Sequence, residues 1–148
     1  LESMELGSNL RMSEVSAAIG LVQLSNLEKW VKRRREIAQK YTEAFANHPH
    51  VSIPKVRNGA EHAWHQYCLR TSAPKKLMKY LDENSIDSRS YYSIPCHHQT
   101  VFTEHPQFQS PMKVTDEVAG NLVAIPVMHE LTDLEVEHII SIVSNFEN

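Results

Sequence analysis

The sequence has little of what marks several common classes of protein. Two cysteines, Cys68 and Cys96, stand far apart among 148 residues, which excludes a disulfide framework and favours a reducing compartment. Four glycines are present, and none forms a glycine-rich phosphate loop. No apolar run approaches the roughly 18 residues that a membrane span needs, and no signal peptide is visible. We therefore expect a cytoplasmic protein without a membrane segment.

Positive charge is not in excess either. The formal net charge is −3, so no basic field points to nucleic acid as a partner. Hydrophobic residues make up 41% and charged residues 22%, a balance typical of a globular chain rather than a disordered one. A chain of this length predicts one hydrophobic core.

Two N-terminal helices are predicted, over about 13–24 and 26–47. Ser13 is a suitable N-cap before an almost wholly apolar stretch, and Ser25-Asn26-Leu27-Glu28 has the pattern of a second capping box. An unbroken helix over both segments would be about 50 Å long, too long for a compact domain. A helix that is apolar on nearly every side is expected to be buried on all sides.

The rest of the chain alternates between strand and helix patterns. Strands are expected at 51–54, 64–71, 86–92 and 123–126, and helices at about 74–83, at 115–122 and after the capping box at Thr132. Residues 93–111 are expected to form a loop. The predicted fold is α+β, a small and mostly antiparallel sheet with helices on one face, divided into a helical arm (1–47) and a small domain (48–148).

Two groups of polar residues are candidates for chemistry. Asn9 and Arg11 precede a helix N-terminus, where backbone N–H groups and an arginine suit an anion; a capped helix with a surface arginine is the alternative. The nine histidines include the neighbours His97 and His98. Because neighbouring side chains on a strand point apart and no HxxxH or CxxC pair accompanies them, we expect no metal site.

Several stretches together resemble one family, the DegT/StrS-type aminotransferases, which use pyridoxal phosphate (PLP) and mostly aminate nucleotide-linked keto-sugars. The resemblance rests on motifs distributed along the whole chain: GSNLRMSEVSAAIGLVQL, KRRREIAQKY, HAWHQYCLR, YYSIPCHHQ and LVAIPVMHELTDLEVEHIISIV. It concerns the C-terminal region of that family and implies the fold of the small domain of its members.

The resemblance also implies roles for particular residues. Asn9 would reach the partner subunit and bind the cofactor phosphate, with Arg11 at the same shared site. Tyr92, Pro95, His97 and Gln99 would line the sugar-nucleotide pocket. The lysine that forms the Schiff base belongs to an upstream region of the family, so the resemblance implies a domain without catalytic residues of its own. PLP is expected in the complete enzyme and not on this chain alone.

The predicted function is therefore that of a C-terminal domain, as a fragment or a truncated homologue, of a sugar aminotransferase. It is expected to form a homo-oligomer, a dimer first of all, through the helix at 13–24, since a large exposed apolar surface is unusual in monomers. The alternative is a stand-alone, non-catalytic interaction or regulatory module that pairs with an intact aminotransferase. A histidine-based metal protein is a third reading.

Overall fold

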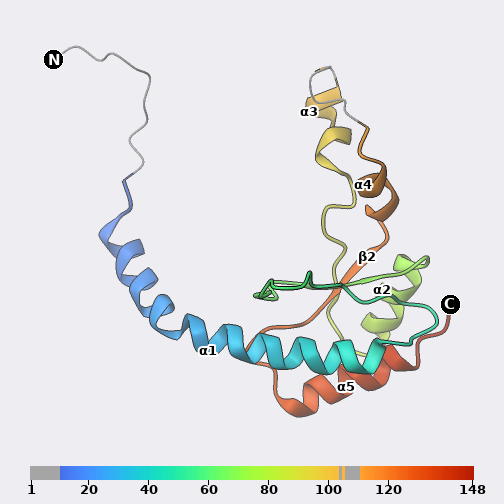
Figure 1. Cartoon of the computed structure of the whole chain (residues 1–148), viewed down its shortest axis with the longest axis horizontal. Helices are drawn as coiled ribbons and strands as arrows, with labels where there is room; N and C mark the ends of the chain where they lie inside the picture. The colour runs from blue at the N-terminus through green and yellow to red at the C-terminus, as the bar shows by residue number, and fades with distance from the viewer. Residues whose placement is uncertain (1–10, 104, 106–110) are drawn as a thin grey trace.

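The computed structural model describes residues 11–103, 105 and 111–148. Their element order is α1 (Glu14–Phe45), β1 (Tyr67–Arg70), α2 (Pro74–Glu83), η1 (Cys96–His98), α3 (Thr100–Thr103), α4 (Lys113–Val118), β2 (Leu122–Ile125) and α5 (Asp133–Ser144). Figure 1 shows α5 running beneath the C-terminal half of α1, with the sheet above them. The expected α+β class with a small antiparallel sheet is confirmed.

Within the described residues the predicted arm contains a single helix, so the predicted division into helices 13–24 and 26–47 is wrong. α1 runs for 32 residues without a break, which corresponds to about 48 Å at 1.5 Å per residue. Ser25 does not cap a second helix, because its Oγ donates a hydrogen bond to the carbonyl of Val22 at 2.8 Å. The Asn26 side-chain amide donates to the same carbonyl at 2.9 Å. Such bonds back to the preceding turn are compatible with an unbroken helix.

The two halves of α1 lie in different surroundings. The C-terminal half inserts Ile37, Ala38, Tyr41 and Phe45 into the core. The N-terminal half extends away from the rest of the described chain (Figure 1), which is how a helix too long for the domain is accommodated. Its large apolar side chains are exposed, and they are Val15, Ile19, Leu21, Val22, Leu24 and Leu27. The expectation that this stretch is buried on all sides is therefore wrong for the chain alone.

The sheet joins parts of the chain that are distant in sequence. β1 and β2 pair antiparallel, with Tyr67 opposite Ile125 and Arg70 opposite Leu122. Single antiparallel bridges extend the pairing on both sides, from Ser52 to Arg70 and from Arg89 to Ala124. Within the described residues, the expected strands at 51–54 and 86–92 are thus reduced to one bridging residue each, because each backbone makes only one such pair with the sheet.

The core lies between the sheet and helices α1, α2 and α5. Tyr41 is its central polar link, since its hydroxyl donates to the Pro126 carbonyl at 2.9 Å while its ring meets that of Tyr67 edge-on, with centroids 5.3 Å apart. Burial raises the pKa of the Tyr41 hydroxyl far above its ordinary value, which keeps the group protonated as a donor. These contacts hold the end of β2 against α1.

An ionic contact outside the core fixes α5 beside α1. Arg33 and Lys40 both approach Asp133 Oδ1, at 3.0 and 2.9 Å, and Arg33 also donates to the carbonyl of Leu131 at 2.8 Å. These two cations lower the pKa of the Asp133 carboxyl. The start of α5 is therefore held by its charge as well as by its apolar face.

Residues 93–103 and 111–121 form the part that extends above the sheet in Figure 1. The segment predicted as a loop contains η1 and α3. The helix predicted at 115–122 is α4, which begins two residues earlier than predicted and ends four residues earlier. Across the described residues, no helix combines the length and the apolar character required to cross a membrane.

The capping box of α5 provides a test of the local fold. Thr132 Oγ1 accepts from the Glu135 backbone N–H at 3.3 Å, and Glu135 accepts from the Thr132 backbone N–H at 2.8 Å. We expect Thr132→Ala to lower the free energy of unfolding by about 1 kcal/mol, because an N-terminal donor of the helix loses its partner. Urea denaturation followed by circular dichroism measures the change. Thr132→Ser, which keeps the hydroxyl, is the control, and an equal loss in both variants would contradict the capping role.

Candidate functional site

Of the two predicted groups of site residues, the structure describes Arg11 of the first and all four residues of the second. Asn9 falls outside the described residues. Arg11 is exposed and precedes the Ser13 cap of α1. Ser13 itself is the N-cap predicted, since its Oγ accepts from the Ser16 backbone N–H at 3.1 Å. Figure 1 places this end of α1 far from α3 and α4, so the chain does not bring Arg11 together with the segment that carries Tyr92 and His97.

The second group forms a short ordered segment. Pro95 is the N-cap residue of η1, which consists of Cys96, His97 and His98. The Gln99 side-chain amide donates to the carbonyl of Ile94 at 3.1 Å and closes this turn upon itself. The four predicted residues Tyr92, Pro95, His97 and Gln99 thus belong to one continuous segment, and the last three lie in or beside η1.

The backbone of Tyr92 has a conformation that residues other than glycine rarely adopt. Its φ angle is 53°, in the left-handed region that is strained for a bulky residue. Its side chain is 82% exposed, so packing against the core does not explain the strain. Strained, exposed residues are common where a protein positions a side chain for a ligand, which makes Tyr92 a candidate contact residue.

Two hollows adjoin this segment. One, of about 350 Å³, is lined by Tyr91 and Tyr92 on one side and by Val114, Thr115 and Val118 of α4 on another. The other, of about 230 Å³, lies along the outer side of β2 and includes the charged groups of Arg34, Asp87 and Arg89. His65 lines this second hollow, whereas Tyr67, two residues later on β1, is buried in the core.

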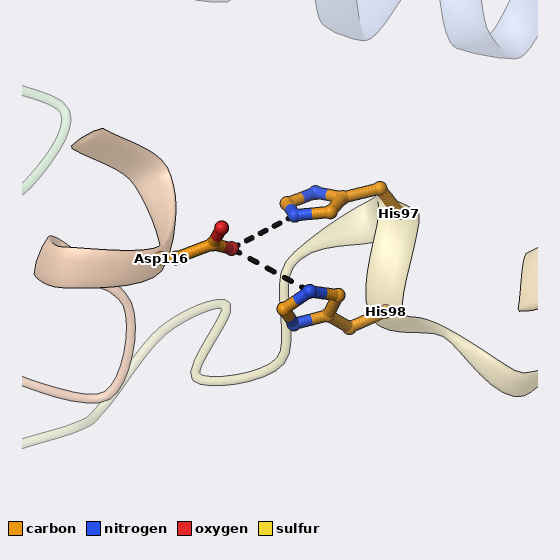
Figure 2. A group of neighbouring side chains, drawn as sticks. All are labelled: His97, His98 and Asp116. Carbon is orange, nitrogen blue, oxygen red and sulfur yellow. Dashed lines mark hydrogen bonds and ion pairs between the residues drawn. The ribbon is translucent and has the colours of Figure 1, made fainter. Parts of the chain in front are cut away.

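His97 and His98 face the same acceptor, Asp116 of α4 (Figure 2). His97 Nε2 lies 2.8 Å and His98 Nε2 lies 3.6 Å from Asp116 Oδ1, and the two imidazole centroids are 4.1 Å apart. The premise that these neighbours point apart is wrong, because they lie in a 3-10 turn and not on a strand. Asp116 was not among the predicted residues, since nothing in the local sequence relates it to the histidines.

The lysines offer no covalent cofactor site. All eight lysines of the sequence lie in described residues, and none is buried. Lys40 is the least exposed of them and is paired with Asp133. A lysine that forms an imine with a cofactor needs a desolvated or otherwise activated amine. The side chains present therefore do not fit the covalent attachment of PLP, whereas the exposed Arg11 is of the type that binds a phosphate.

A comparison with protein-family models matches residues 1–144 to the DegT/DnrJ/EryC1/StrS aminotransferase family. Among curated proteins, a dTDP-3-amino-3,6-dideoxy-alpha-D-galactopyranose transaminase of Aneurinibacillus thermoaerophilus is 31% identical, over 98% of this chain and 39% of that protein. A pleiotropic regulatory protein of Geobacillus stearothermophilus is 29% identical, over 95% of this chain and 38% of that protein. The chain thus spans about two fifths of the length of these relatives.

Solved structures share the fold. AtS13 from Actinomadura melliaura superposes with a TM-score of 0.87 at 18% identity, over 99% of this chain and 38% of that one. DesV from S. venezuelae, in complex with a ketimine intermediate, gives a TM-score of 0.85 at 22% identity, over 98% of this chain and 40% of that one. At these identities the likeness concerns the fold alone.

Proposed function

Because the chain belongs to the DegT/DnrJ/EryC1/StrS aminotransferase family, we propose that it is the C-terminal domain of a PLP-dependent nucleotide-sugar aminotransferase. Two observations support this most directly: residues 1–144 match the family model, and the chain covers only 39% of a 31% identical transaminase. When bound, PLP supplies the electron sink that carries the amino group between substrates. This domain would contribute contacts to the cofactor phosphate, to the sugar nucleotide and between subunits.

The first contact is to the cofactor phosphate. Asn9 and Arg11 precede the N-terminus of α1, and family resemblance assigns them to the phosphate held by a partner subunit. The N-terminal end of α1, which Arg11 precedes, lies away from α3 and α4 (Figure 1), and this supports a role for Arg11 in another subunit. A guanidinium forms strong charge-assisted hydrogen bonds to phosphate oxygens, and an asparagine amide adds a neutral donor.

The second contact is to the sugar nucleotide. The turn that carries Tyr92, Pro95, His97 and Gln99 would form part of the pocket wall. Its exposed Tyr92 adjoins the hollow shared with α4, and an aromatic ring can stack on a nucleotide base or the apolar face of a sugar. His97 and Gln99 provide side chains that hydrogen-bond to hydroxyl groups. Substrate binding in this proposal orients the keto-sugar and excludes water.

The third contact is between subunits. The apolar residues of the N-terminal half of α1 have no cover within the described chain, and such a surface is typical of a protein–protein interface. A second copy of the chain, laid along this half of α1, would bury it and carry Arg11 toward the partner. A stand-alone oligomeric module would use the same surface, so activity and assembly need separate tests.

The chain alone is expected to be inactive. After incubation with PLP and reduction with borohydride, peptide mass spectrometry should find several exposed lysines modified at low occupancy, because none of the eight is desolvated. Amino transfer from an amino acid to a nucleotide-linked keto-sugar should be undetectable. Stoichiometric modification of a single lysine, or transfer activity that depends on it, would contradict the proposal.

In the complete enzyme, Asn9→Ala should reduce PLP retention about tenfold or more, because a hydrogen bond to a charged group contributes roughly 1.5–3 kcal/mol. The measurement is the cofactor absorbance that remains after dialysis. Asn58→Ala, in an exposed turn, is the matched control. Equal retention in Asn9→Ala and Asn58→Ala would remove Asn9 from the cofactor site.

The chain should sediment as a dimer at micromolar concentration, and the double substitution Ile19→Glu with Val22→Glu should make it monomeric. Each glutamate would place an unpaired charge in the interface, which costs several kcal/mol. Neither residue belongs to the core, so thermal unfolding of the monomer should still be cooperative. Gln23→Glu adds one charge at an exposed polar position directly after Val22 and should be tolerated better. A monomer before any substitution would refute the dimer.

A further inference from the structure

His97, His98 and Asp116 bring three metal-binding atoms together outside the core (Figure 2). One ring nitrogen of each histidine and one carboxylate oxygen all lie within 4.8 Å of one another. The side chains differ in exposure, from 12% for His97 to 39% for Asp116 and 53% for His98. One ligand is thus nearly shielded from water, while the other two remain open to an entering ion.

We propose that these three side chains form a binding site for a divalent cation of the zinc type. Zinc binds histidine nitrogen and carboxylate oxygen at about 2.0–2.2 Å in tetrahedral geometry, which places neighbouring ligand atoms roughly 3.3 Å apart. The two nitrogen–oxygen separations of 2.8 and 3.6 Å lie on either side of that value. Small side-chain rotations therefore suffice to arrange the atoms around an ion.

The ligand types decide which cations the site would select. Imidazole nitrogen suits Zn²⁺, Co²⁺, Ni²⁺ and Cu²⁺, whereas Mg²⁺ and Ca²⁺ prefer sites made of oxygen ligands. The Asp116 carboxylate offsets one of the two positive charges of the ion. Three protein ligands leave the fourth tetrahedral position to water or to an oxygen of another molecule, as in open zinc sites.

A bound ion would connect two separate elements. His97 and His98 belong to η1 and Asp116 to α4, so coordination would join both sides of the part that extends above the sheet. Val114 and Thr115, which precede Asp116, line the hollow beside Tyr92. The ion would therefore fix the position of α4 beside that hollow. The inference shares His97 with the proposed pocket wall, but ion binding requires neither cofactor nor substrate.

The test uses the 148-residue chain after treatment with a chelator. Titration with Co²⁺ should produce visible d–d absorption that saturates at one equivalent and is removed by added Zn²⁺, while Mg²⁺ has no effect. His98→Gln and Asp116→Asn should each weaken Co²⁺ binding by at least about tenfold, since each removes one of three ligands. Both side chains are partly exposed, and circular dichroism verifies that the variants fold.

His138→Gln is the matched control, because His138 is an exposed histidine of α5 outside the cluster. It should bind Co²⁺ as the unmodified chain does. Binding that falls equally in His138→Gln and His98→Gln would show unspecific contact with surface histidines and overturn the proposal. Absence of saturable binding to the unmodified chain would overturn it as well. Neither outcome affects the proposed aminotransferase function, whose tests measure PLP retention, activity and assembly.

Discussion

The burial of the C-terminal half of α1 is the constraint on which the rest of the structure depends. Ile37, Tyr41 and Phe45 contribute large side chains to the only extended core that the described residues form, and Tyr41 also holds the carbonyl of Pro126 at the end of β2. With a sheet of two short strands, few backbone pairings are available to hold the fold. Nine of the 18 described core residues lie on α1, α2 and α5, and their burial stabilises the fold in proportion to the apolar area removed from water.

Local signals in the sequence predicted three helix starts and failed where contacts between distant parts of the chain decide the structure. Ser13, Pro74 and Thr132 mark helix starts through their own chemistry, and all three lie where the sequence predicts. Ser25 is also a residue type that caps helices, but it lies inside α1, where its hydroxyl donates to the carbonyl of Val22 in the preceding turn. A strand depends on a partner strand, and the segment around Arg89 pairs at only one residue.

The candidate site shows the same division. The residues of the segment from Tyr92 to Gln99 were predicted because they follow one another in the sequence and resemble a family motif. Asp116 was missed because it lies 19 residues after His97, and their contact exists only in the folded chain. The left-handed backbone of Tyr92 was equally invisible, since no glycine or asparagine marks the position. The fold was thus more accessible from sequence than the geometry of the site.

The continuity of α1 has a consequence for how such a chain can change. A helix advances by about 100° per residue, so an uninterrupted helix fixes the rotational phase of its exposed half relative to its buried half. Insertion of a single residue between Leu27 and Ile37 would rotate the apolar surface around Ile19 by more than a quarter turn. Two helices joined by a hinge could take up the same insertion without this rotation. Substitutions along this stretch alter one side chain, whereas length changes redirect an entire surface.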